Sequence, residues 1–428
     1  MRKFILISTG IAFLLTDLFA DNLDIVKGLI QDFVSGNFTI AESLFTDQMK
    51  QALPPSKMKE VWNQIENQFG QFESIEGIKI SQSGEYTVFD LFSKFQKSYL
   101  DILVTVDKNS KVAGLFFRPA SRFYEIPPYA ITSKFEIKKI EIGNEYKVPA
   151  ELTIPNGKGP FPAVILIAGS GPEDMNESIG PNRPFEDIAY GLSSNGIVVL
   201  RFDKSTYVYA KEFESGQIKT DLENEYFKDA LDGIEFLKSQ SYVKNVFILG
   251  HSEGGYLDPA IAKMSDKASG IILLAAPARN LEDVMIDQFD YLISITKDST
   301  ETQQMKVMIS QLEEIKAHKL KDSTIVMGAP ASYYYEVDSY NPIDILKTLK
   351  MPVLVMQGGK DYQVTKKDYD IFKENFGSDD NFTFKWFEDL DHIFMKWEGI
   401  PSPDQYLVSG HVSDDVIKEI VKWINSNS

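Results

Sequence analysis

Short apolar segments separated by polar, helix-length stretches fill most of the chain beyond residue 135. The segments are Ala163 to Ala168, Ile197 to Phe202, Val246 to Leu249, Gly270 to Ala275, Pro352 to Met356 and Phe382 to Phe387. Continuous apolar runs of this length are typical of strands buried on both faces of a parallel sheet. Before them, Phe135 to Ile142 and Tyr146 to Ile154 read as antiparallel strands joined by a turn at Gly143-Asn144. The pattern predicts an α/β domain with a mostly parallel sheet.

The segment from Asn22 to about Ala120 has a different pattern. It opens with amphipathic helices, the first of which places Ile25, Leu29 and Phe33 on one face. Later stretches rich in aromatic and branched residues indicate strands at Tyr86 to Phe95, Tyr99 to Val106 and Val112 to Arg118. The prolines in 126–129 cannot continue a helix or a central strand, which indicates a linker. We therefore expect a small α+β domain over residues 21–125 and a larger domain over 126–428.

One stretch interrupts the alternation of strands and helices. Residues 281–346 are mostly helical and polar, and they contain Ser332-Tyr333-Tyr334-Tyr335. An insertion over the sheet is the simplest explanation. Because ligands of doubly wound folds bind at the carboxyl ends of the strands, we expect a cap that shapes a substrate pocket. Tyr333 and Tyr334 are the expected pocket wall, and ordinary packing within the cap is the alternative for both.

Composition narrows the possible partners. The chain of 428 residues carries a formal net charge of -18, which argues against binding to nucleic acid or to anionic membrane surfaces. It contains no cysteine, so disulfides, thiolate metal sites and a cysteine nucleophile are excluded. We expect a small-molecule partner and neither a metal nor another cofactor. The oligomeric state stays open.

The amino terminus resembles an export signal. Arg2 and Lys3 precede the apolar run Phe4 to Leu15, and Ala20 suits the position before a cleavage point. The run is too short to span a bilayer, and the sequence has no second hydrophobic stretch that is long enough. We therefore expect a signal peptide over residues 1–20 and a periplasmic or secreted protein without a stable membrane span.

The sequence Gly250-His251-Ser252-Glu253-Gly254-Gly255 follows an apolar strand and precedes a helix-compatible segment. A G-x-S-x-G match between a strand and a helix is typical of a nucleophile elbow, in which the glycines permit a sharp turn. Ser252 then lies at a helix amino terminus, where backbone N–H groups favour developing negative charge. Ser252 is the expected nucleophile.

A seryl hydroxyl needs an adjacent base, and the chain has four histidines. His251 lies on the elbow itself, His318 belongs to a lysine-rich surface helix, and His411 precedes the last helix. His392 follows the final expected strand in a loop, which makes it the expected base.

The carboxylate that orients the base should follow a strand between the serine and the histidine in chain order. Asp361 meets this condition, and Asp389 and Asp391 are the weaker alternatives. The oxyanion of an acyl-transfer intermediate also needs donors. We expect these to be the backbone N–H groups of Glu253 and of Ser170, in Gly169-Ser170-Gly171-Pro172. A phosphate-binding loop is the competing interpretation of these glycines, but the Lys-Ser/Thr ending is missing.

Together these motifs resemble bacterial α/β-hydrolases of the dienelactone-hydrolase and serine-aminopeptidase-like group, near cinnamoyl and feruloyl esterases. The resemblance begins at about Phe135 and rests on Gly169 to Pro172, Asn182 to Phe185, Arg201 to Lys204, Gly250 to Gly255, Gln357 to Tyr362 and Asp391-His392. It departs from the family at Ala168, where histidine is common, and after Lys204. The amino-terminal part looks like a small uncharacterised domain that often precedes such hydrolases.

Three functions follow as hypotheses. The first is hydrolysis of a carboxylic ester through an acyl-enzyme with Ser252, His392 and Asp361. The second is a serine peptidase of the aminopeptidase type acting on short peptides, which would require an acidic pocket for the substrate ammonium group. The third is a binding protein without catalysis. Because a fold does not determine its substrate, the choice between ester and peptide rests on the resemblance.

Overall fold

The computed structural model describes residues 9–120 and 124–428, which divide into two compact units. The first unit contains the residues up to Glu125 together with Ile179–Asn182 and Trp397–Gly410. The second contains Ile126–Ser178, Arg183–Lys396 and His411–Ser428. The leader expected over residues 1–20 begins in residues 1–8, which lie outside the described range. No helix of the described range is long and apolar enough to cross a membrane.

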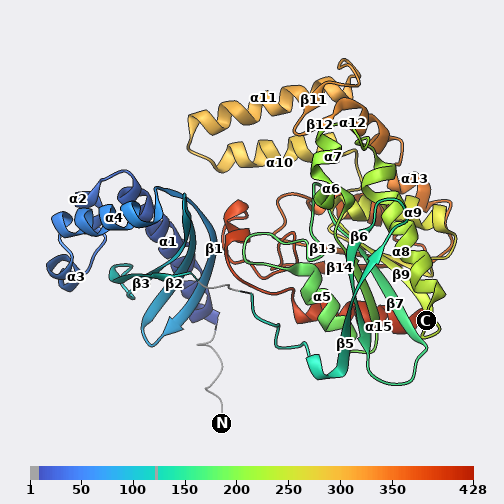
Figure 1. Ribbon diagram of the computed structural model, residues 1–428, viewed down its shortest axis with the longest axis horizontal. Helices are drawn as coiled ribbons and strands as arrows, with labels where there is room; N and C mark the ends of the chain where they lie inside the picture. The colour runs from blue at the N-terminus through green and yellow to red at the C-terminus, as the bar shows by residue number, and fades with distance from the viewer. Residues whose placement is uncertain (1–8, 121–123) are drawn as a thin grey trace, which may run out of the picture. The chain divides into compact units, whose positions relative to one another are not determined.

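Helices precede an antiparallel sheet in the first unit (Figure 1). The helices are α1 (Thr9–Val34), α2 (Phe38–Ser43), α3 (Asp47–Ala52) and α4 (Pro55–Phe69). The strands follow in spatial order as β1 (Phe72–Ser83), β2 (Tyr86–Phe95), β3 (Ser98–Val106) and β4 (Val112–Pro119). The last three are the strands that the sequence indicates. The pattern does not indicate β1, because register shifts at 72–74 and 75–77 break its period of two.

The core of the first unit includes residues from late in the chain. Trp62 of α4 lies against Phe33, with ring centroids 5.5 Å apart. Trp397, Leu407 and Val408 pack against the same cluster. The helical turn η3 (Pro403–Leu407) precedes an isolated parallel bridge between Val408 and Ile78.

Asn182 ties the two late segments of the first unit together. Its side chain is fully buried, and Nδ2 donates to the carbonyl oxygens of Tyr406 and Val408, each at 3.0 Å. Its Oδ1 accepts from the backbone N–H of Gly410 at 2.9 Å. Nothing in the hydrophobic pattern indicated that these segments leave the second unit.

A mixed sheet in the order β14-β13-β10-β9-β7-β8-β6-β5 forms the centre of the second unit. Its strands are β5 (Phe135–Ile142), β6 (Val148–Pro155), β7 (Phe161–Ile167), β8 (Val198–Phe202), β9 (Val243–His251), β10 (Gly270–Leu274), β13 (Val353–Gly358) and β14 (Phe382–Phe387). Neighbours from β14 to β8 run parallel, whereas β6 is antiparallel to β8 and to β5. The expected strands and the expected hairpin are confirmed.

Helices cover both faces of this sheet. On one face α8 (Lys228–Ser239), α9 (Glu253–Ser265), α13 (Pro342–Leu346) and α14 (Lys366–Phe376) share a large apolar core with the strands. On the other, α5 (Pro184–Ser193) contacts β6 and β8 and lies beside α15 (Asp414–Ser426) (Figure 1). Short segments complete the unit: η1 (Thr132–Lys134), α6 (Ser205–Val208), α7 (Ala210–Glu214) and the π-helical η2 (Glu223–Phe227). The expected α/β class is confirmed.

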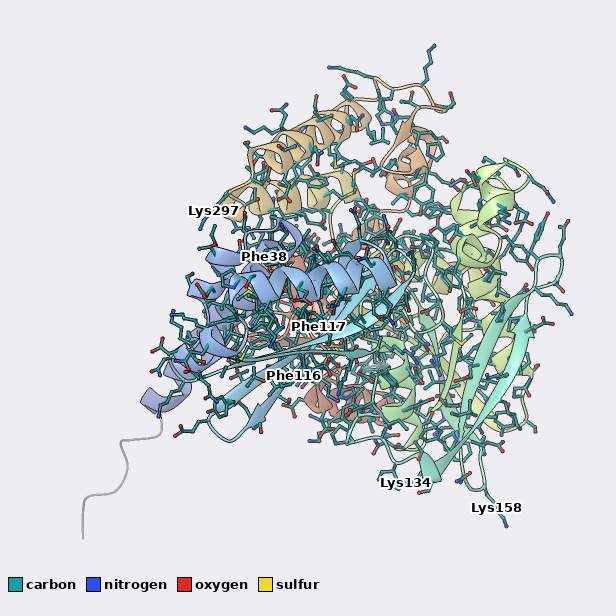
Figure 2. All side chains as sticks on the ribbon, turned by 60° about the vertical axis from the view of Figure 1, so that its left-hand side comes forward. Phe38, Phe116, Phe117, Lys134, Lys158 and Lys297 are labelled. Atoms are coloured by element: carbon teal, nitrogen blue, oxygen red, sulfur yellow. The ribbon has the colours of Figure 1, made fainter. Side chains whose placement is uncertain are left out.

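The cap expected between residues 281 and 346 is inserted between the adjacent strands β10 and β13. It contains α10 (Leu281–Ile295), α11 (Ser299–Lys316), the short strands β11 (Ile325–Val326) and β12 (Ala329–Pro330), and α12 (Ala331–Asp338). Figure 1 shows α10 and α11 as a hairpin, with Lys297 in its turn in Figure 2. Lys134 and Lys158, also labelled in Figure 2, mark the opposite end of the sheet, where β7 begins. A small cluster with Leu312, Ile315 and Tyr334 forms the cap's own core.

Candidate active site

The carboxyl ends of the parallel strands bring the expected reactive residues to one edge of the sheet. Ser252 follows β9, Asp361 follows β13 and His392 follows β14. Since β9, β10, β13 and β14 are parallel and sequential in the sheet, the loops that follow them lie at the same edge. This edge is therefore the candidate active site.

Ser252 occupies a strained turn between β9 and α9. Its backbone has φ 52° and ψ -123°, a conformation that non-glycine residues rarely adopt. Its N–H donates to the carbonyl oxygen of Leu274 at 2.9 Å, which fixes the turn against β10. The elbow also needs glycine at position 254, where a Cβ would lie 2.3 Å from the carbonyl oxygen of Ile167. The turn places Ser252 at the amino end of α9, as the sequence predicts.

His392 is hydrogen-bonded to Asp361. Its Nδ1 lies 2.7 Å from Asp361 Oδ2, and both side chains are buried. Asp361 Oδ1 accepts from the backbone N–H groups of Gln363 and Val364 at 2.8 and 3.0 Å. Gln357 Nε2 donates to Oδ2 at 2.9 Å. The carboxylate is thus held in one orientation, which selects the imidazole tautomer protonated on Nδ1 and leaves Nε2 on the far side of the ring.

The alternative carboxylates have other surroundings. Asp391 accepts from the backbone N–H groups of Ile393 and Met395 at 3.1 and 2.9 Å, so it shapes the loop that carries His392. Burial raises the pKa of Asp391 to about 7, and these N–H donors oppose the rise. Asp389 is exposed.

The remaining histidines differ in their roles. His318 is exposed and stacks on Tyr335 with ring centroids 4.4 Å apart. His411 Nδ1 lies 3.3 Å from both carboxylate oxygens of Asp187. His251 is buried, and it connects Glu177 to His392: Nδ1 lies 2.9 Å from Glu177 Oε1 and Nε2 lies 2.8 Å from the carbonyl oxygen of His392.

His251 is a buried cation at neutral pH. Burial alone would lower its pKa, but the charge and hydrogen bond of Glu177 outweigh burial and raise the pKa to about 9. With both ring nitrogens protonated, Nε2 donates to the carbonyl oxygen of His392 and Nδ1 donates to Glu177. The sequence did not indicate this link between the elbow and the loop of the base.

In the loop after β7, both the N–H and the C=O of Gly169 have side-chain hydrogen-bond partners. Glu177 Oε1 accepts from the N–H of Gly169 at 2.6 Å. The carbonyl oxygen of Gly169 accepts from Lys204 Nζ at 2.9 Å and from Tyr226 Oη at 2.8 Å. Ser170, the expected oxyanion donor, follows directly and lines the same pocket as Ser252.

Glu253 is buried in a polar cluster next to Ser252. Tyr333 Oη donates to Glu253 Oε1 at 3.0 Å, and Tyr226 Oη lies 3.3 Å from Oε2. Burial and then the nearby Glu225 raise the pKa of Glu253 to about 7, while Lys204 acts against the rise. The carboxylate thus lies in the first turn of α9 and is in direct contact with two tyrosine hydroxyls.

A pocket of about 830 Å³ opens beside Ser252. Its apolar wall comes mainly from the cap, with Leu281, Val284, Met285, Ile325, Met327 and Pro330. Glu214, Glu225 and Glu253 are its acidic residues, and none of the described lining residues is Lys, Arg or His. Tyr333 and Tyr334 both lie in the lining and are largely buried. The pocket thus combines an apolar cap side with a polar floor.

Several residues that surround this site were assigned no role from the sequence: Glu177, Lys204, Glu225 and Tyr226. Lys204 was the one residue whose position in the sequence could have indicated this cluster. It follows the buried strand β8 closely, and a cation at the carboxyl edge of such a sheet needs a partner of opposite charge. Among the residues that the structure describes, no group of His, Asp and Glu is arranged to hold a metal ion.

Two segments of the chain match known protein families. Residues 181–396 match the family described as serine aminopeptidase, S33. Residues 27–115 match a family described as a protein of unknown function, DUF3887, in the amino-terminal unit where an uncharacterised domain is expected.

Comparison with curated proteins finds one relative, and Est1E and an acylaminoacyl peptidase are among the solved structures that resemble part of the chain. Esterase EstD of Thermotoga maritima is 40% identical over 396 residues, which cover 92% of this chain and 93% of EstD. Est1E from Butyrivibrio proteoclasticus is 17% identical, with a TM-score of 0.46 over 67% of this chain and 99% of Est1E. The acylaminoacyl peptidase of Pyrococcus horikoshii is 14% identical, with a TM-score of 0.46 over 82% of this chain and 56% of the peptidase.

Proposed function

Since the chain belongs to the serine aminopeptidase S33 family of α/β-hydrolases and is therefore a hydrolase, we propose that it cleaves carboxylic esters through an acyl-enzyme on Ser252. The relative that is 40% identical is named an esterase, which supports this chemistry. The main structural support is the buried hydrogen bond of 2.7 Å between His392 and Asp361, at the sheet edge that carries the strained Ser252.

The proposed reaction has two halves. Ser252 Oγ attacks the ester carbonyl carbon, and His392 Nε2 takes the hydroxyl proton. Backbone N–H groups of Glu253 and Ser170 stabilise the negative oxygen of the tetrahedral intermediate. The proton then passes from His392 to the departing alcohol. Water attacks the acyl-enzyme in the same way, which releases the carboxylic acid and restores Ser252.

The pocket supports a neutral, apolar acyl or aryl group as the substrate moiety. Val284 and Met285 of α10 and Met327 contribute apolar surface, and a pocket of about 830 Å³ accommodates a medium-sized ester. An anionic group on this side of the substrate would lose hydration without a cationic partner from the described lining.

A second candidate function is cleavage of short peptides with a free amino terminus, which Glu225 and Glu253 favour because both line the pocket. Neither offers an unpartnered carboxylate, however. Glu225 Oε1 is paired with Lys204 Nζ at 2.7 Å, and Glu253 interacts with two tyrosine hydroxyls. A substrate ammonium would have to displace these partners, so we favour the ester.

Labelling with a fluorophosphonate tests the nucleophile. The wild type should be labelled, and Ser252→Ala should not, with an unchanged melting temperature as the control for folding. Equal labelling of both proteins would refute the proposed mechanism. Turnover of p-nitrophenyl esters against aminoacyl and dipeptidyl p-nitroanilides then separates the two functions, because faster turnover of the amides would favour the peptidase.

We also propose that the protein is exported, from the basic residues Arg2 and Lys3 and the apolar run behind them. Expression of the full chain in a bacterial host tests this. Mass spectrometry of the protein outside the cytoplasm should find a new amino terminus close to residue 21, and an intact Met1 in that fraction would contradict cleavage.

A further inference from the structure

Two buried side chains donate hydrogen bonds to one carbonyl group beside the nucleophile. Lys204 Nζ lies 2.9 Å and Tyr226 Oη lies 2.8 Å from the carbonyl oxygen of Gly169. This carbonyl belongs to the peptide group that also contains the N–H of Ser170. Neither Lys204 nor Tyr226 lines the pocket, whereas Ser170 and Ser252 do. The two side chains therefore contact the site through the Gly169 carbonyl and through the carboxylates of Glu225 and Glu253.

Because the peptide group is planar, these two contacts also determine the direction of the Ser170 N–H. A trans peptide is planar, so its N–H points away from its C=O. Two donors that fix the carbonyl oxygen of Gly169 thus fix the direction of the Ser170 N–H on the opposite side. We propose that Lys204 and Tyr226 are positioning residues, which hold the Ser170 N–H in the direction needed to bind the oxyanion. This inference rests on the proposed ester hydrolysis.

The lysine is itself rigidly held. Its side chain is 2% exposed, and Nζ lies 2.7 Å from Glu225 Oε1 and 3.8 Å from the centroid of the Tyr226 ring. A buried ion pair contributes little net stability, because desolvation of both charges offsets their attraction. The pair with Glu225 has a local role instead: it holds Lys204 Nζ where its remaining protons can reach the Gly169 carbonyl oxygen.

The same loop is anchored from its other side. Glu177 Oε1 accepts from the N–H of Gly169, so both polar groups of this residue have buried partners. Rotation of the Gly169-Ser170 peptide would break two hydrogen bonds at once. The Ser170 N–H is thereby oriented before the substrate arrives, as efficient stabilisation of a transition state requires.

Removal of these contacts should affect the transition state more than the bound substrate. Tyr226→Phe deletes one donor and keeps the ring, and we expect kcat to fall about tenfold with KM within about twofold. The paired change Lys204→Met with Glu225→Gln removes both charges of the buried pair, and we expect kcat to fall about 100-fold. Tyr190→Phe is the matched control, since it deletes another buried hydroxyl, bonded to Glu186 at 2.8 Å on α5.

The experiment uses the full-length protein and a p-nitrophenyl ester, with melting temperatures and a trifluoromethyl ketone inhibitor as additional measurements. The ketone forms a tetrahedral oxyanion on the serine, so its affinity should fall in parallel with kcat in both variants but not in Tyr190→Phe. Equal losses in Tyr226→Phe and Tyr190→Phe would overturn the proposal, as would a change in KM alone. If Ser252→Ala retains activity, the proposed function fails instead, and the fluorophosphonate experiment identifies that case separately.

Discussion

His392 Nδ1 lies 2.7 Å from Asp361 Oδ2, although the two residues follow different strands, β14 and β13. The contact depends on the parallel pairing of these strands, which runs from Val353 opposite Phe382 to Gly358 opposite Phe387. The other carboxylate oxygen of Asp361 accepts from the backbone N–H groups of Gln363 and Val364. The orientation of the imidazole is therefore set by the sheet edge.

Replacing Asp361 with Asn should lower kcat by roughly 10³ to 10⁴-fold, because the amide favours the wrong tautomer of His392. KM should change little, since Asp361 does not line the pocket. Steady-state kinetics with a p-nitrophenyl ester measures both constants. Asp389→Asn is the matched control in the loop of the base, because Asp389 is exposed and its loss should leave kcat within about twofold. A large loss in Asp389→Asn alone would reassign the orienting carboxylate.

The pair of Glu177 and His251 should make stability depend on pH. The folded pKa of His251 is raised from 6.5 to about 9, so its stabilising effect is complete below pH 6.5 and is lost as the pH rises toward about 9. Glu177→Gln should therefore reduce the free energy of unfolding by about 2 kcal/mol at pH 6 and by less at pH 9.5. Chemical denaturation at the two pH values measures the difference. A loss of equal size at both would argue against a protonated His251.

Glu253 should also make stability fall as the pH rises, but over a lower pH range than His251. Its pKa is raised from 4.5 to about 7, so the folded protein retains a proton that the unfolded chain loses, and stability falls as the pH rises between these values. Tyr226, Tyr333, Glu225 and Lys204 surround the group. Glu253→Gln removes this ionisation, so its melting temperature relative to the wild type should be higher at pH 8 than at pH 5. An unchanged difference would mean that Glu253 is already ionised at pH 5.

A negative charge on the substrate should strongly lower kcat/KM. Glu214, Glu225 and Glu253 line the pocket, none of its described lining residues is basic, and Lys204 behind the lining is paired with Glu225. We expect mono-p-nitrophenyl succinate to be cleaved with a kcat/KM at least about tenfold below that of p-nitrophenyl pentanoate. Glu214→Gln should reduce the difference in kcat/KM between the two esters. It should leave kcat/KM for the neutral ester unchanged, because Glu214 is exposed at the rim of the pocket. Preference for the succinate would show that the pocket does not select against anions.

Asn182→Ala should destabilise the protein, because it leaves two carbonyl groups and one N–H without their partner. We expect a loss of about 2 to 3 kcal/mol in the free energy of unfolding. Asn195→Ala is a suitable control, since Asn195 makes a single bond of 2.9 Å to the carbonyl oxygen of Gly191. Thermal denaturation of both variants provides the comparison, and equal losses would contradict a special role for Asn182.

The sequence predicts those parts of the fold that depend on local pattern. Apolar strands such as Val246 to Leu249 are recognisable because both faces are buried, and each strand end marks a reactive loop. Ser252 is recognisable for a similar reason, since its turn requires glycines at fixed neighbouring positions.

The polar partners of the loop after β7 were not predictable in this way. Tyr226 lies on a π-helical segment far along the chain from Gly169, and the contact depends on how that segment packs. Glu177 also has a positive φ of 50°, which no local pattern indicated. These contacts arise from tertiary packing, so neither hydrophobic periodicity nor motif spacing predicts them.

The bridge between Ile78 and Val408 has a consequence for biosynthesis. Residues 9–120 leave the ribosome well before Trp397, Leu407 and Val408, which pack against their core. Contacts between residues so distant in sequence form slowly, because the intervening chain must first be ordered. The apolar surface that these late residues cover is thus exposed until the second unit has been translated.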